Sequence, residues 1–293
     1  NRQGEYNWHY VQGEPIRNEQ GTIIKWIGSF TNIQYQKNIT AHLEKVVEER
    51  TRELQRSNED LQQFAHVASH DLKEPVRKIM VFNSLLREEL RQVLSGKADT
   101  WLSKIEHAAQ RMNAMIDGVL LYSTVNSMDQ TRIPIDLNEL MQQVETDLEV
   151  MISQKHAMVR YKELPLVSGL PLLIYQLFYN LVNNSLKFSR KDVSPVITVR
   201  DEQPGEDDIA AHRLSDHLSY IKIVVEDNGI GISEEDAARI FGAFTRLHSK
   251  DQFEGTGLGL ALCKKIAERH GGAIWAEHRG QEGAMFCILL PAG

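Results

Sequence analysis

The sequence predicts a multidomain protein in which a short β-rich segment precedes an all-α helical hairpin and a C-terminal α+β domain. With 293 residues, the chain is longer than one typical domain. The first 33 residues are rich in aromatic and β-branched side chains, which favour strands. Long helical runs fill residues 38–125, and residues 133–293 alternate helix-like and strand-like runs, as α+β domains do.

The composition excludes several classes of protein. An apolar share of 42% and a charged share of 25% are those of an ordinary globular protein. The net charge is -7 and no basic stripe is present, so we expect no nucleic-acid partner. No apolar run approaches the ~20 residues that span a bilayer, so we expect no membrane segment in this chain. Two cysteines, Cys263 and Cys287, offer no disulfide framework, which predicts a cytoplasmic protein.

The N-terminal segment predicts two strands. "YNWHYVQGEPI" and "IIKWIGSFTNI" are aromatic and β-branched, and the intervening "NEQG" is a turn signal. The pair is too small to bury a core of its own. We therefore expect it to be the end of a larger β-rich domain.

The next segment predicts a coiled coil that leads into a helical hairpin. Helical periodicity runs to about Leu94 and stops at the short loop "SGKAD". A second run, "TWLSKIEHAAQRMNAMIDGVLLYSTV", reaches about Val125, and two such helices pack antiparallel. The heptad seam is half polar, so we expect a homodimer that forms a four-helix bundle; a linker helix bound to nothing is the alternative. The seam contains Leu43, Val47, Arg50, Leu54, Ser57, Leu61, Phe64 and Ala68.

The C-terminal domain predicts one mixed sheet under helices. The last strands, "AIWAEH" and "AMFCILLP", form a hairpin, and "HGG" ends the helix before them. The acidic stretch 201–208 is most simply a solvated loop. Helices are expected at 137–152, 171–188 and 258–270, and further strands at 158–162, 196–200 and 220–226.

The helix at 171–188 has a polar face. Gln176, Asn180, Asn184 and Lys187 fall within a stripe about 80° wide, opposite an apolar face that should pack on the sheet. Amide oxygens suit Mg²⁺, which shares its ligands with phosphates, and a lysine one turn on supplies a positive charge. The alternative is a polar face that is simply solvated.

Two glycine-rich segments predict a ligand site. In "VVEDNGIGI", Asp227 ends a strand, and Gly229 and Gly231 permit close approach of the backbone; an ordinary turn is the alternative. In "EGTGLGLALCKKI" the glycines open a helix, whose N-terminus attracts anions. The long stretch "IFGAFTRLHSKDQF" between them is a candidate lid.

The segment "ASHDLKEPV" predicts an exposed nucleophile on the first long helix. His70 lies about 180° from the apolar seam, so its imidazole faces solvent. Asp71 can accept the proton of one ring nitrogen and leave the other free to attack. His66, one turn earlier, has no acidic residue after it and is the expected surface histidine.

Pro75 lies within the same helix. It has no N–H for the carbonyl of Asp71 and costs an interior helix ~3 kcal/mol or more. We therefore expect a hinge beside His70, through which movement of the coiled coil changes the exposure of the imidazole.

The order of these motifs resembles the sensor histidine kinases. Their catalytic domain is an α+β sandwich of the GHKL, or Bergerat, type, shared with gyrase, chaperone and mismatch-repair ATPases. "NLVNNSLKF" is similar to the N box, "DNGIGI" to the first glycine box, "IFGAFTRL" to the F box and "GTGLGLA" to the second glycine box. "SHDLKEPVR" resembles the phospho-acceptor box of the subgroup that contains bacterial phytochrome kinases.

The resemblance implies a role for each matching residue and a domain for each segment. Asn184, with Asn180, would bind Mg²⁺; Lys187 and Arg246 would contact the phosphates of ATP, and Asp227 the adenine amine. Gly229 and Gly231 would shape the pocket, and Gly255, Thr256, Gly257, Leu258 and Gly259 would hold the phosphate tail. "PIRNEQGTIIKWIG" resembles the last strands of a PAS domain, which implies upstream sensor domains. The expected domains are 1–33 PAS, 34–63 coiled coil, 64–128 dimerisation and phosphotransfer, and 133–293 ATP binding.

The implied function is an ATP-dependent autokinase that phosphorylates His70 and passes the group to an aspartate of a response-regulator receiver domain. Many family members have Thr or Asn four residues after the histidine, which positions a water for phosphatase activity. Glu74 stands there in this chain, so we expect mainly a kinase. The alternatives are a GHKL-fold ATPase or serine kinase, and a non-catalytic pseudokinase scaffold.

Overall fold

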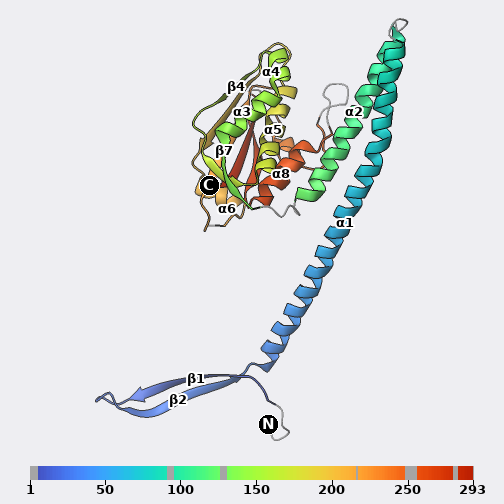
Figure 1. The fold of residues 1–293 in the computed structure, drawn as a ribbon. Coiled ribbons are helices and arrows are strands. Elements are labelled where there is room, and N and C mark those ends of the chain that lie inside the picture. Colours follow the sequence, from blue (N-terminus) through green and yellow to red (C-terminus); the bar gives the residue numbers. More distant parts are fainter. Residues whose placement is uncertain are drawn as a thin grey trace. The chain divides into compact units, whose positions relative to one another are not determined.

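The computed structural model describes residues 6–90, 96–125, 131–215, 217–247, 256–279 and 283–292. The chain divides into two compact units, Asn1–Gln63 and Phe64–Gly293, which are considered separately (Figure 1). Within the described residues, no helix is long and apolar enough to cross a membrane.

The N-terminal unit contains the two predicted strands. β1 (His9–Arg17) and β2 (Ile23–Asn32) pair antiparallel, with His9 opposite Asn32. A turn joins them, in which the side chain of Asn18 accepts hydrogen bonds from the backbone of Gln20 and Thr22. The large apolar side chains of the hairpin stay exposed, as expected of strands that lack the rest of a core.

Two long helices follow. α1 (Gln34–Glu89) continues through Pro75, and α2 (Lys97–Thr124) ends within one residue of the predicted limit. α1 ends five residues before the predicted Leu94, and residues 91–95 lie outside the described part of the chain. The hairpin has a small core in which Val76 of α1 packs with Ala109 and Ile116 of α2.

The hairpin core uses a different stripe of α1 from the heptad seam, which is predicted to pack in a dimeric bundle. Leu72 and Ile79 lie on the same side of α1 as Phe64, which belongs to the heptad seam, and Phe64, Leu72 and Ile79 are 70%, 55% and 42% exposed in the single chain. The side that faces α2 is smaller and more polar, and its buried residues are Ala65, Ser69, Val76 and Asn83. The apolar seam of α1 is therefore left uncovered by the hairpin itself.

The C-terminal domain is built on a five-stranded mixed sheet, which confirms the predicted α+β class. One pair of strands is parallel and the others are antiparallel. In sheet order the strands are β4 (Met158–Tyr161), β6 (Val196–Glu202), β7 (Tyr220–Asp227), β9 (Ala284–Pro291) and β8 (Ala273–His278).

Three helices make the layer that covers the sheet: α3 (Leu137–Asp147), α5 (Pro171–Lys187) and α8 (Gly259–Arg269) (Figure 1). The apolar face of α5 is fully buried through Leu173, Leu177 and Phe178, as its periodicity predicts. The shared core positions the opposite, polar face of α5 towards the edge where β7 ends and α8 begins.

Several elements differ from the sequence-based expectation. The predicted helix 137–152 is interrupted at Leu148, after which α4 (Glu149–Lys155) begins. A small additional sheet pairs β3 (Ile133–Asp136) with β5 (Leu166–Gly169). The stretch 201–208 is not a loop throughout: β6 extends to Glu202, and α6 (Glu206–Ala211) begins inside it. A short helix, α7 (Glu234–Ala237), follows the first glycine segment.

His270 fixes the end of α8 inside the core. Its ring is fully buried, Nδ1 donates to the Ile266 carbonyl at 2.7 Å, and Nε2 accepts from the Leu170 backbone N–H at 2.9 Å. Only a neutral imidazole can donate from one nitrogen and accept at the other. Burial accordingly lowers the pKa of His270 below its ordinary value.

Candidate active site

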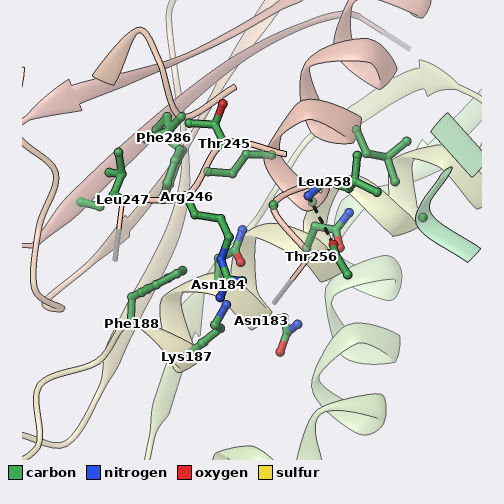
Figure 2. A pocket seen from close by; sticks show the side chains of 18 of the residues that line it. Asn183, Asn184, Lys187, Phe188, Thr245, Arg246, Leu247, Thr256, Leu258 and Phe286 are labelled. Carbon is green, nitrogen blue, oxygen red and sulfur yellow. Dashed lines mark hydrogen bonds between the residues drawn. The ribbon is translucent and has the colours of Figure 1, made fainter. Parts of the chain in front are cut away.

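The polar face of α5 borders a cavity of about 550 Å³ at the edge of the sheet (Figure 2). The predicted stripe lines it in full, since Gln176, Asn180, Asn184 and Lys187 all contribute to its wall. The start of α8 forms the facing wall through Thr256, Gly257, Leu258 and Gly259. The two motifs that the sequence separates by about 70 residues therefore share one pocket.

Asn180 and Asn184 lie together opposite the start of α8. A Cβ atom on Gly259 would come 3.8 Å from Asn180 Oδ1 and 3.9 Å from Asn184 Nδ2. Gln176 donates to Asn180 Oδ1 at 3.2 Å, while the buried Nδ2 of Asn180 makes no well-formed hydrogen bond within the described part of the chain. Amide oxygen and nitrogen exchange places by rotation of the side chain. The pair thus offers the oxygen ligands that fit Mg²⁺ beside a phosphate chain.

Asp227 closes the inner end of the pocket. It is the last residue of β7, is 8% exposed, and accepts hydrogen bonds from the backbone N–H groups of Gly229 at 2.9 Å and Ala284 at 3.2 Å. Ser185 of α5 donates to its other oxygen at 2.9 Å. Burial raises the pKa of Asp227, and these donors oppose that rise. A buried, oriented carboxylate is suited to accept a hydrogen bond from an amine of a ligand.

The glycines of both segments are required by close contacts. At Gly229 a Cβ atom would lie 2.7 Å from the Phe188 carbonyl oxygen. Gly257 has a φ of +74°, and a Cβ atom there would lie 2.9 Å from the backbone of Phe244 and Thr245. Gly231, also with positive φ, lines the pocket. Gly255, the first glycine of the second segment, lies outside the described residues.

The predicted lid is only partly described. Thr245, Arg246 and Leu247 line the pocket, and Figure 2 shows Arg246 extending towards Asn184 and Lys187. Residues 248–255 lie outside the described part of the chain, so closure of a lid stays a prediction. Two cationic side chains, Arg246 and Lys187, thus border the same space as the two asparagines.

Sequence reasoning missed part of this pocket. Ser185 lies among the apolar residues of α5, and a lone polar residue on that face was the available signal. Asp117 and Gly118 of α2 also line the cavity, and a Cβ atom on Gly118 would come 3.2 Å from Leu258 Cδ1. No sequence pattern pairs α2 with this loop, because the contact joins residues 140 positions apart.

The structure exposes the imidazole of the predicted nucleophile. The side chains of His70 and Asp71 are 76% and 73% exposed, and His70 Nδ1 lies 3.3 Å from Asp71 Oδ1. A carboxylate can only accept, so Nδ1 carries the proton in this contact and Nε2 keeps a lone pair. The arrangement provides an accessible nitrogen nucleophile with its tautomer fixed by the neighbouring acid.

Charged partners surround His70 on α1. Lys73 forms an ion pair of 2.5 Å with Asp117 of α2, which joins the two helices of the hairpin. Glu74 is paired with Lys78 at 2.8 Å, and the hydrogen bond from that ammonium lowers the pKa of the carboxyl. Pro75 is accommodated without an interruption of the helix, and its role as a hinge remains a prediction.

Comparison with protein families matches both parts of this arrangement. Residues 60–127 match the His Kinase A (phospho-acceptor) domain, and residues 169–293 match the histidine kinase-, DNA gyrase B- and HSP90-like ATPase family. The first match contains His70, and the second contains the pocket residues of α5, β7 and the α8 region.

Known relatives are similar to this chain over most of its length. Cyanobacterial phytochrome A of Nostoc sp. is 36% identical over 244 residues, which are 82% of this chain and 30% of the relative. Phytochrome-like protein Cph1 of Synechocystis sp. is 34% identical over 242 residues, 83% of this chain and 30% of the relative. Sensor protein GacS of Pseudomonas syringae is 30% identical over 236 residues, which are 78% of this chain and 24% of the relative. The chain thus spans about 30% of the length of the phytochromes it matches.

A solved structure shares the fold. The crystal structure of full-length ShkA in complex with AMPPNP aligns with a TM-score of 0.59 at 19% identity, covering 78% of this chain and 46% of that one. Fold and site together define a phospho-acceptor helical hairpin followed by a GHKL-type ATPase domain. The chain belongs to the sensor histidine kinases of two-component systems.

Proposed function

We propose that this chain is an ATP-dependent autokinase that phosphorylates His70 and transfers the phosphoryl group to an aspartate of a response-regulator receiver domain. The observation that carries the proposal is the contact of Asp71 with His70 Nδ1, which leaves an exposed Nε2 lone pair. The same chain supplies a nucleotide-type pocket lined by the asparagine pair, Asp227 and the glycine loop.

The proposed reaction is a displacement at the γ-phosphorus of ATP. Nε2 of His70 forms the new N–P bond while the bond from the γ-phosphorus to the bridging oxygen breaks, and ADP leaves. The imidazole becomes positively charged as the N–P bond forms, and Asp71 accepts the Nδ1 proton, which leaves a neutral phosphoimidazole. General-base assistance of this kind is worth about 10²–10⁴-fold in rate.

The pocket residues bind and orient ATP in this scheme. Asp227 accepts a hydrogen bond from the adenine amine, and Lys187 and Arg246 offset the negative charge of the phosphates. Gly257 and Gly259 present backbone N–H groups at the start of α8 to the phosphate chain. Asn184, supported by Asn180, would hold Mg²⁺, which neutralises phosphate charge when bound.

The active form in this proposal is a homodimer. It acts in the cytoplasm, where ATP is available. The uncovered seam of α1, which includes Phe64, Leu72 and Ile79, would pack on a second copy to complete a four-helix bundle. The histidine kinase A domain supports dimerisation. Residues 34–63 would act as a coiled-coil signalling helix, and β1–β2 as the end of a PAS sensor domain, in a longer protein.

The proposal favours kinase over phosphatase activity. A phosphatase needs a residue near His70 that orients a water towards the phosphorylated partner. Glu74 stands in that position, but its carboxylate is engaged by Lys78 at 2.8 Å. Its oxygens are therefore less available to a water than those of an unpaired side chain.

The decisive assay incubates the chain with γ-labelled ATP and Mg²⁺ and then treats it with acid. An acid-labile label that is lost in His70→Ala is the expected result, because phosphohistidine hydrolyses in acid. His66→Ala is the matched control, since His66 is an exposed histidine one turn earlier on the same helix and should leave labelling unchanged. An acid-stable label would instead indicate a serine kinase, and no label would indicate a pseudokinase scaffold. Transfer is then tested with a receiver domain and its Asp→Ala variant.

A further inference from the structure

A second cavity, of about 570 Å³, lies directly beside His70 and is separate from the nucleotide pocket. Its wall comes mainly from α1, at positions spaced three and four residues apart along one face, and Asn113 of α2 closes it from the other helix. The residues that line it are His70, Lys73, Glu74, Arg77, Met80, Val81 and Asn113. A site of this size next to the nucleophile has room for a tetrahedral anion.

The charged side chains that line this cavity are not all paired. Lys73 is neutralised by Asp117 at 2.5 Å, and Glu74 is neutralised by Lys78 at 2.8 Å. Arg77 forms no ion pair with any residue in the described part of the chain. Among the charged side chains that line the cavity, the guanidinium is therefore the one that no ion pair matches in the described part of the chain; Asp71, which contacts His70 at 3.3 Å, is not part of the wall.

The helix geometry directs Arg77 towards His70. Seven residues make two turns of α-helix less about 20°, so the two side chains lie on one face, about 10.5 Å apart along the axis. Side chains in a helix lean towards its N-terminus, which brings a long side chain at position 77 back over position 73 and towards position 70. The planar guanidinium presents paired N–H groups that match two phosphate oxygens.

We propose that this cavity is an anion site for the phosphoryl group carried by His70, and that Arg77 is the positioning residue that holds it. The inference rests on the proposed function, since it assumes that His70 is the phosphorylated residue. Arg77 would stabilise the dianionic phosphoryl group and orient it away from the imidazole for transfer. Lys73 would contribute once the phosphoryl group competes with Asp117 for its ammonium.

The test loads His70 chemically, so that it does not depend on kinase activity. Phosphoramidate transfers its phosphoryl group to histidine: the P–N bond of the reagent breaks, ammonia leaves, and an N–P bond forms at the imidazole. The chain has 11 histidines, and a parallel reaction of His70→Ala identifies the ³¹P resonance of His70 by its loss. The pKa of that phosphoryl group is then measured by ³¹P NMR titration.

The expected result is a lower phosphoryl pKa in the unaltered chain than in Arg77→Gln, by about half a unit for an exposed charge pair. Arg77→Lys should recover part of the shift, because it keeps the charge and loses the paired geometry. Lys104→Gln, which removes one exposed positive charge from α2 outside the cavity, should titrate like the unaltered chain. Circular dichroism of each variant reports whether the hairpin is folded.

Equal phosphoryl pKa values in the unaltered chain and in folded Arg77→Gln would overturn the inference. Failure of phosphoramidate to load an exposed His70 beside this cavity would overturn it as well. If the ATP assay fails but the pKa shift is found, the kinase proposal is wrong and the anion site stands. If labelling by ATP succeeds and the pKa shift is absent, the kinase proposal stands and the anion site is wrong.

Discussion

Ser185 donates a hydrogen bond of 2.9 Å to Oδ2 of Asp227, which joins the last turn of α5 to the end of β7 inside the pocket. Both residues are almost fully buried, so loss of the hydroxyl leaves the carboxylate oxygen without that donor. We expect Ser185→Ala to raise the pKa of Asp227 further. The free energy of unfolding of the domain should fall by about 1–3 kcal/mol.

That change should weaken ATP binding about tenfold, because Asp227 loses a donor that orients its carboxylate towards the ligand. Isothermal titration calorimetry measures the affinity. Ser84→Ala removes a hydroxyl that bonds the Val81 carbonyl on α1 and should bind ATP normally. Unchanged affinity in Ser185→Ala would contradict the role given to Asp227.

Comparison of Gly257→Ala with Gly271→Ala distinguishes two effects of an added Cβ atom: strain of the backbone at positive φ, and a steric clash with neighbouring backbone. Both glycines have positive φ, +74° and +75°, so each alanine is strained by about 1–2 kcal/mol. Only at Gly257 would the new Cβ atom also meet backbone, at 2.9 Å. We expect both variants to melt earlier, but only Gly257→Ala to lose ATP binding beyond its loss of stability. Equal ATP affinity in the two variants would argue against a tight fit of the glycine loop.

Asn184→Ala tests the proposed metal site. In the unaltered chain, removal of Mg²⁺ with a chelator should weaken ATP binding, and in Asn184→Ala the same removal should have little further effect. Partners that only support a metal ligand are worth about 10–100-fold in affinity, so a direct ligand should cost at least that much. The cycle is completed by measuring both proteins with and without Mg²⁺. A full Mg²⁺ dependence in the variant would place the metal on other ligands.

His270 predicts a specific loss of stability in mild acid. Its folded-state pKa lies below the ordinary value of about 6.5, so the unfolded chain binds the proton more readily than the folded one. The free energy of unfolding should therefore fall as the pH drops from about 6.5 towards the lowered pKa. The change would come from disruption of the Leu170 N–H contact at Nε2.

His270→Gln should remove this part of the pH dependence, measured as the difference between the two denaturation curves across that window. If the variant does not fold, the imidazole resonances of the unaltered chain give the same information by NMR. The resonances of His270 should titrate below the ordinary value of about 6.5 while the domain stays folded. Titration near pH 6.5 in the folded state would show that the ring is not held neutral.

Pro75→Ala tests the hinge. Alanine restores the hydrogen bond to the Asp71 carbonyl and should stabilise α1 by about 3 kcal/mol. In a full-length protein we expect a changed ratio of autokinase to phosphatase rates, because a stiffer helix would transmit movement differently. Higher thermal stability with both rates unchanged would make the proline a local defect without a signalling role.

The sequence was a good guide where one local pattern decides the outcome. The stripe from Gln176 to Lys187 lies on the pocket side of α5, and the two apolar runs at the end of the chain form the predicted hairpin of β8 and β9. The break at Leu148 was missed because helical periodicity continues on both sides of it. β3 and β5 were missed because four-residue strands carry little pattern and are defined by their pairing.

Other features depend on contacts between distant segments. The heptad seam of α1 does not face α2, since the stripe of Ala65 and Val76 packs against that helix instead. The hydrogen bond from Ser185 to Asp227 joins positions 42 residues apart, and no spacing rule connects them. The cavity beside His70 arises only when Asn113 of α2 lies against α1.

Because the heptad seam of α1 is uncovered, we expect the stability of the helical hairpin to depend on protein concentration and that of the sheet domain not to. The sheet domain buries a large core within one chain, so its unfolding is unimolecular and indifferent to dilution. In its described residues, the hairpin has an apolar core cluster of only Val76, Ala109 and Ile116, and it exposes many large apolar side chains. In a homodimer its folding is tied to association, and its midpoint then rises with protein concentration. The fraction of chains with a folded, dimeric phospho-acceptor hairpin would then depend on the concentration of the protein in the cell.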